Sequence, residues 1–190
     1  MKTHEMRSRN LLFSARALLL SLLLIVGSSV AFAKSAQEID VSVDVALEQF
    51  NKDIKGGKEF LKSAKGVLVF PNVVKAGFVV GGTYGEGALR IGGMTVDYYS
   101  TAAASFGFLA GAQSVRVIIV FMQDDALQKF QVSKGWEAGV DGSVTLVNVG
   151  AAGTIDTTTA RDPIVGFVFG NAGLMADLSL TGSKYTKIAR

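Results

Sequence analysis

The side chains that perform most enzyme chemistry are missing from the larger part of this sequence. It contains no cysteine, and its one histidine, His4, lies near the N-terminus. Residues 34–190 therefore cannot form Ser-His-Asp or Cys-His arrangements or the usual zinc ligand sets. They show no D-x-D or EF-hand spacing, and their glycines match neither the phosphate-loop nor the dinucleotide-binding fingerprint. We predict a protein that is not an enzyme and has no catalytic residue, metal ion or cofactor.

Lysine side chains are the remaining groups that could bind a ligand, and they are concentrated in one region. Residues 52–75 contain six lysines but only two acidic residues. If residues 58–64 form a short helix, a rotation of about 100° per residue places Lys58, Lys62 and Lys65 on one side. Such a face is the best candidate for contacting phosphate groups. The alternative is an ordinary solvated helix face, which is the usual role of a run of charges.

The N-terminal segment has the pattern of a secretory signal. Basic residues precede an apolar run at residues 17–26, and Ala31-Phe32-Ala33 offers a small-x-small cleavage site. The run is shorter than the roughly 20 residues that a membrane-spanning helix needs. We expect residues 1–33 to be removed as a signal peptide, and residues 34–190 to be exported to the periplasm or cell envelope. Without a cysteine, anchoring by acylation of that residue is excluded.

Removal of this segment would change the charge balance of the protein. The full sequence has 19 basic and 16 acidic residues, whereas residues 34–190 have 15 of each. The exported part is therefore formally neutral. Nucleic acid is not an expected partner, because its phosphate backbone requires a clear excess of basic residues. The length of residues 34–190 fits one domain with a single substantial core.

Hydrophobic periodicity predicts helices at two places in this domain besides residues 58–64. Residues 35–38 (SAQE) form a capping box, and apolar residues then recur at helical spacing over residues 39–54. A later short helix is expected to begin with Asp124 or Asp125 as its N-cap and to end before Gly135. The apolar stripe of the first helix is expected to pack on a sheet, because such a stripe more often faces a protein core than a membrane.

The rest of the domain is predicted to be β structure. Residues 94–111 are expected to form one or two strands through the interior. Residues 115–122 read as an almost uninterrupted apolar strand, so both of its faces must be covered. From Trp136 onwards, short β-rich runs alternate with turn signals, which predicts a meander or hairpins.

Closely spaced glycines mark the segment from Gly77 to Gly87. If this segment is one strand, its period of two places Gly77, Gly81, Gly85 and Gly87 on one nearly bare face. Repeated glycine inside a strand indicates a bend, a bulge or another group pressed against the backbone. Curvature of a small barrel or coiled sheet is the favoured interpretation. A surface approached by a ligand is the alternative.

Four blocks of the sequence, in this order, resemble the SYLF domain family, a lipid-binding module also described as an actin regulator in eukaryotes. The blocks are AKGVLVFP with KAGFVVGGTYGEG at residues 64–87, FGFLAGAQS at 106–114, VRVIIVFM at 115–122 and GLMADLSLTG at 173–182. Eukaryotic members carry a tryptophan-containing segment where this sequence has residues 95–100 (TVDYYS). The exported bacterial branch of the family is therefore the better comparison.

The resemblance implies binding of anionic phospholipid headgroups, such as those of phosphoinositides, at a membrane surface. The candidate headgroup-binding residues are Lys55, Lys58, Lys62, Lys65, Lys75, Lys184 and Lys187. The last two are expected to join the others only if the last strand returns beside the first. One alternative is a structural or protein-interaction module of the cell envelope, and another is a carrier of a small apolar ligand.

These patterns together predict a single β-rich α+β domain. Its core is expected to be a curved antiparallel sheet or partly closed barrel, built from the glycine-rich and valine-rich strands. The N-terminal helices are expected to cover this sheet.

Overall fold

The computed structural model describes residues 34–77, 80–106, 113–147, 155, 161–170, 173–174 and 180–190. Every element described below belongs to one compact unit, residues 34–190. The predicted signal peptide lies outside the described residues. So do parts of three blocks that carry the family resemblance, at residues 78–79, 107–112 and 175–179.

Three helices have the positions that the sequence predicts. They are α2 (Ala36–Asp53), α3 (Gly57–Ser63) and α4 (Asp124–Val132). The capping box of α2 is present, because the Ser35 side chain accepts a hydrogen bond from the Glu38 N–H, and the Glu38 carboxylate accepts one from the Ser35 N–H. Between α2 and α3 the chain reverses through Gly56, whose φ of 81° lies in the left-handed region that favours glycine.

The predicted cap of α4 is wrong. Its N-cap is Gln123, which makes no side-chain capping hydrogen bond, and both Asp124 and Asp125 lie inside the first turn. Their carboxylates stabilise the helix through its dipole, since the N-terminal end of a helix carries partial positive charge. The helix also ends earlier than predicted, because Ser133 is already extended.

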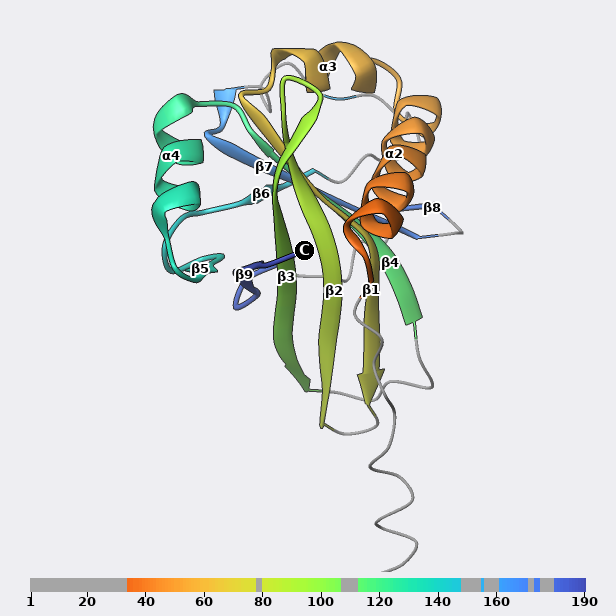
Figure 1. Ribbon diagram of the computed structural model, residues 1–190, viewed down its shortest axis with the longest axis vertical. Coiled ribbons are helices and arrows are strands. Elements are labelled where there is room, and N and C mark those ends of the chain that lie inside the picture. Colours follow the sequence, from red (N-terminus) through yellow and green to blue (C-terminus); the bar gives the residue numbers. More distant parts are fainter. Residues whose placement is uncertain are drawn as a thin grey trace, which may run out of the picture. The chain divides into compact units, whose positions relative to one another are not determined.

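In the part of the chain that the structure describes, nine strands form one sheet in the order β5-β9-β3-β2-β1-β4-β7-β6, with β8 paired to β7 (Figure 1). The strands are β1 (Gly66–Gly77), β2 (Val80–Ile91), β3 (Met94–Phe106), β4 (Gln113–Phe121), β5 (Trp136–Glu137), β6 (Thr145–Leu146), β7 (Ile164–Gly170), β8 (Gly173–Leu174) and β9 (Lys184–Ile188). The pairings are antiparallel except that of β6 with β7, so the sheet is mixed.

The described C-terminal strands do not form the predicted meander, although the consecutive strands β7 and β8 pair antiparallel, as the alternative of hairpins requires. Strand β5 pairs with β9 and not with β6, the strand that follows it in sequence. Strand β6 does bond to the next strand, β7, but this pairing is parallel and is therefore not a hairpin. The runs from Trp136 onwards instead extend both ends of the sheet.

The sheet curls strongly about its central strands. In a flat sheet β1 and β9 would lie about 14 Å apart, because β2 and β3 separate them. The rings of Phe70 on β1 and Tyr185 on β9 nevertheless approach to a centroid distance of 5.6 Å. The inner face of this half-barrel therefore closes on its own side chains.

Glycines allow the curl, but the predicted single strand over residues 77–87 is wrong. The chain reverses between Gly77 and Val80, and Gly77 at the end of β1 faces Gly81 on β2. A Cβ atom on Gly85 would lie 2.9 Å from the backbone oxygen of Asn72, and one on Gly87 would lie 2.0 Å from that of Val69. The group pressed against the bare face is thus the neighbouring strand β1, which supports the curvature interpretation.

A bulge in β1 explains the closest of these approaches. The register with β2 shifts between Val69 and Asn72, and the register with β4 shifts between Phe70 and Val73. Pro71 lies in this bulge, where its missing N–H is tolerated because the ladder is already interrupted. Gly87 lies opposite the bulge and leaves room for the displaced backbone.

Two hydrophobic clusters cover the two faces of the sheet. On β4, Val117, Ile119 and Phe121 belong to the inner cluster with α4, whereas Ile118 and Val120 belong to the outer cluster with α2 and α3. The prediction that both faces of this strand are covered is confirmed. The protein is a single β-rich α+β domain in which a curled sheet packs against the N-terminal helices, as predicted.

Candidate functional site

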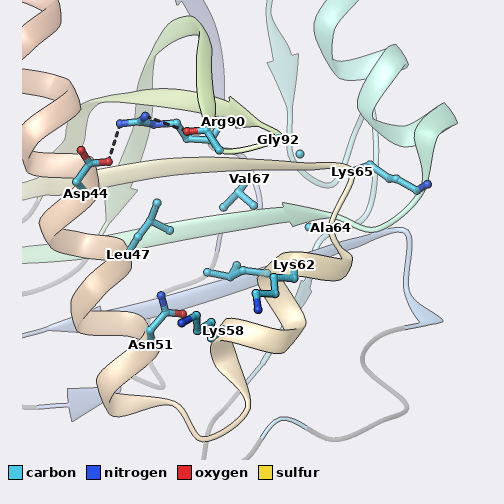
Figure 2. Close-up of a pocket in the computed structure, with 13 residues that line it drawn as sticks. Asp44, Leu47, Asn51, Lys58, Lys62, Ala64, Lys65, Val67, Arg90 and Gly92 are labelled. Atoms are coloured by element: carbon cyan, nitrogen blue, oxygen red, sulfur yellow. Dashed lines mark hydrogen bonds and ion pairs between the residues drawn. The ribbon is translucent and has the colours of Figure 1, made fainter.

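Four segments of the chain surround a groove of about 450 Å³ at the α3 end of the sheet (Figure 2). We call it the lysine groove. Its lining comes from α2 (Asp44, Leu47, Asn51), α3 (Lys58, Leu61, Lys62), the start of β1 (Ala64, Lys65, Gly66, Val67) and the end of β2 with its turn (Arg90, Gly92, Gly93). The lining contains four cationic side chains and one carboxylate, so its formal charge is positive.

Lys58 and Lys62 lie on one side of α3, as their spacing of four predicts. Phe60 on the opposite side is buried in the outer cluster, where its ring packs edge-on against Phe167 at 5.7 Å. This packing fixes the rotation of the helix, so both lysines are exposed. Among the ion pairs of the described residues, none involves Lys58 or Lys62.

Lys65 also lines the groove but has a partner. Its Nζ lies 3.2 Å from the Asp124 carboxylate in the first turn of α4, and both side chains are largely exposed. Figure 2 shows its side chain extending away from Lys58 and Lys62. The predicted face of three lysines is therefore present as two lysines inside the groove and a third at its edge.

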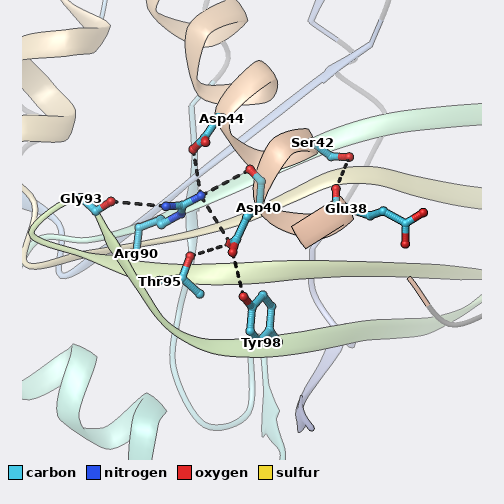
Figure 3. Close-up of polar contacts among 8 residues, drawn as sticks. All are labelled: Glu38, Asp40, Ser42, Asp44, Arg90, Gly93, Thr95 and Tyr98. Carbon is cyan, nitrogen blue, oxygen red and sulfur yellow. Dashed lines mark hydrogen bonds and ion pairs between the residues drawn. The ribbon is translucent and has the colours of Figure 1, made fainter. Parts of the chain in front are cut away.

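Arg90 is the cation that sequence reasoning missed. Its guanidinium lies 2.8 Å from Asp44 and 3.4 Å from Asp40, and its side chain is 14% exposed (Figure 3). Two carboxylates from α2 thus neutralise it. Its buried Nε–H has no hydrogen-bond partner within the part of the chain that the structure describes. A single arginine in a β-rich segment just before Gly92-Gly93 was the only signal in the sequence.

Asp40 joins Arg90 to a wider network between α2 and the β2–β3 hairpin. Thr95 Oγ1 and Tyr98 Oη each donate a hydrogen bond to its carboxylate, at 2.7 and 2.8 Å (Figure 3). Burial, with the hydrogen bond to the charged Asp40, raises the pKa of the Tyr98 phenol. The phenol therefore remains a donor at neutral pH, and the network holds this wall of the groove to α2.

The other four predicted lysines do not line the groove. Lys55 is exposed just after α2. Lys75 lies near the far end of β1, roughly 30 Å from Gly66 at about 3.3 Å per residue. The last strand β9 lies beside β3 and β5 and not beside β1, so Lys184 and Lys187 do not join the others. Lys187 instead pairs with Asp97 at 2.5 Å.

The described residues include no group of three or more histidine, cysteine, aspartate or glutamate side chains placed to hold a metal ion. None of the helices described combines the length and hydropathy needed to cross a lipid bilayer.

Comparison with known proteins identifies the C-terminal half of the domain. Residues 102–189 match the family model Ysc84, described as "Las17-binding protein actin regulator". The match begins within β3 and ends after β9, so the lysine groove lies N-terminal to it. No curated protein matches the chain. The family that residues 102–189 of this chain match is thus the Ysc84 family, which is the SYLF domain family.

Proposed function

We propose that the protein binds anionic phospholipid headgroups at a membrane surface, through the lysine groove. One observation carries the proposal: Lys58 and Lys62 face the same groove and take part in no ion pair among the described residues. Membership of the SYLF domain family generally implies lipid binding by a non-catalytic module. Clustered phosphates, as in a phosphoinositide, suit two flexible ammonium groups that lie one helical turn apart.

The surroundings of the two lysines suit a lipid better than a free anion. Leu47, Leu61 and Val67 supply an apolar part of the groove lining. The next residue after the glycine turn at its edge, Met94, is 71% exposed. An exposed apolar side chain beside cations can enter the headgroup region while the ammonium groups contact phosphate.

The magnitude expected for the lysines is modest. Each lysine near an anionic membrane surface contributes about 1 kcal/mol, and 1.4 kcal/mol corresponds to a tenfold change in an equilibrium constant. Replacing two lysines with glutamine should therefore weaken binding by about 30-fold. Binding of this kind is reversible and decreases with salt, because ions screen exposed charges.

Liposome sedimentation tests the proposal. The variant Lys58→Gln/Lys62→Gln should bind liposomes containing an anionic phospholipid about 30-fold less tightly than the parent, with unchanged circular dichroism. Lys75→Gln/Lys184→Gln is the matched control, because it removes the same charge outside the groove. If both variants lose affinity equally, or if the first binds like the parent, the groove is not the headgroup site.

A second candidate is a protein-interaction module of the cell envelope. It is favoured by an apolar cross-strand pair on the β1–β2 hairpin, where Val74 is 40% and Tyr84 54% exposed. The family description, which names binding to a protein, points the same way for relatives. The sedimentation assay separates the two candidates, because this hairpin carries little charge and would give no dependence on anionic lipid.

We also propose that the protein is exported, with residues 1–33 removed. The charged start, the short apolar run and the small-x-small site support this proposal.

A further inference from the structure

Glu86 on β2 is a buried carboxylate contacted by a neighbour on its own strand and by two residues far away in the sequence. Its side chain is only 8% exposed. Its Oε1 accepts hydrogen bonds from Tyr84 Oη at 2.9 Å and from Arg190 Nη2 at 2.5 Å. Its Oε2 accepts one from the backbone nitrogen of Lys34 at 3.3 Å. A buried carboxylate needs such partners, because an unpaired charge in the interior is costly.

The third of these partners, the backbone nitrogen of Lys34, is the one that removal of residues 1–33 would change chemically. In the unprocessed chain the Lys34 nitrogen is a neutral amide with one N–H. Lys34 is also the first residue of the compact unit 34–190, and Ala31-Phe32-Ala33 immediately precedes it. A cut at the small-x-small site would therefore free the nitrogen that already contacts Glu86.

We propose that cleavage between Ala33 and Lys34 converts this contact into an ion pair, so that the new α-ammonium of Lys34 is held by Glu86. An endoprotease with small-x-small specificity breaks the C–N bond with one water molecule. The water oxygen joins the Ala33 carbonyl carbon, which leaves as a carboxylate, and the Lys34 nitrogen becomes an amine. That amine takes up a proton near neutral pH, because an α-amino group ordinarily has a pKa of about 7.7–8.0.

The resulting cluster would join the start of α2, the middle of β2 and the end of the chain. Each carboxylate oxygen of Glu86 then contacts one cation, Arg190 at Oε1 and the α-ammonium at Oε2. The carboxylate is already ionised, so the gain comes from the full positive charge on the donor, whose attraction to the carboxylate is stronger in a buried site than in water. Removal of the leader therefore strengthens a contact that the fold already has. This inference is independent of the lipid-binding proposal, since none of these residues lines the lysine groove.

The test uses the full precursor, expressed in a bacterial host with an active signal peptidase. Mass spectrometry of the purified product should give a chain that begins at Lys34. A second precursor carries one extra alanine between Ala33 and Lys34, so its product has the ammonium about 3.8 Å further along the chain. The Lys34 nitrogen of that product remains an amide. Each precursor is also made with Glu86→Gln, and with Glu48→Gln as a control at an exposed carboxylate.

The expected result is a difference between the two backgrounds. Glu86→Gln should lower the Tm of the native product about 2 to 4 °C more than it lowers the Tm of the alanine-extended product. Glu48→Gln should lower both equally. A product that begins elsewhere than Lys34, or an equal loss in both backgrounds, overturns the inference.

A second measurement decides the question if the Glu86→Gln proteins do not fold. The α-amine of the native product should react more slowly with an amine-acylating reagent at neutral pH than that of the alanine-extended product. The reason is that an ion-paired ammonium gives up its proton less readily. Equal reaction rates overturn the inference.

Discussion

Gly87 should be the least replaceable glycine of the curled sheet. A Cβ atom there would lie 2.0 Å from the Val69 backbone oxygen and 2.8 Å from Cδ1 of the buried Phe70. Val69 cannot easily move, because β1 is bonded on one side to β2 and on the other to β4. Overpacking of this kind typically costs about 1–3 kcal/mol, and contact with backbone in a central strand favours the upper end. Gly87→Ala should therefore lower the Tm by about 6 to 12 °C, at about 2–4 °C per kcal/mol for a domain of this size.

The matched control is Gly82→Ala, five residues earlier on the same strand. A Cβ atom on Gly82 would meet only the Ala103 backbone oxygen, at an ordinary 3.4 Å. This variant should remain within about 0.5 kcal/mol of the parent. Thermal melting by circular dichroism, with urea unfolding as a second probe, measures both. If the Gly87→Ala and Gly82→Ala variants have the same Tm, then β1 does not press on the bare glycine face of β2 and our explanation of the curl is wrong.

Two further predictions concern α2 and the inner cluster. Ser35→Ala removes the acceptor of the capping box and should lower the free energy of unfolding by about 1 kcal/mol in urea titrations; no loss would mean that the box contributes nothing. Burial, with the nearby charge of Asp97, raises the pKa of Tyr99 to about 12 from an ordinary value near 10. The unfolded chain then loses this proton first, so stability is complete below about pH 10 and falls as the pH rises towards 12. Tyr99→Phe should therefore show a shallower alkaline decline in Tm than the parent, and an equal decline would contradict the assignment.

Local patterns predicted most of the secondary structure, because they act within a few residues. The capping box at Ser35 starts α2, and Gly56 lies between it and α3, which begins at Gly57. The apolar run at residues 115–122 is the two-faced strand β4. Where local signals were nearly equivalent, the prediction was wrong, as at the cap of α4, where Gln123 holds the position expected for Asp124 or Asp125.

Pairing between strands was beyond the reach of such patterns. Glycine spacing indicated a bare strand face, but it could not show that the chain reverses between Gly77 and Val80 or that β1 carries the bulge. The order of the C-terminal strands could not be predicted from local patterns either, because β5 pairs with β9 near the end of the chain. Register and strand order depend on contacts between segments far apart in sequence, which periodicity does not record.

For the candidate site, too, local patterns predicted some features and contacts between distant segments decided the others. Residue types alone determined that residues 34–190 lack histidine and cysteine, and helical spacing placed Lys58 and Lys62 on one face of α3. Only the tertiary structure decided that these two share a groove with Arg90, that α2 carboxylates neutralise that arginine, and that Lys75 and Lys184 lie elsewhere. The physical reason is that the charge available to a ligand depends on which distant side chains fold against each cation, and the amino-acid sequence records the cations without their partners.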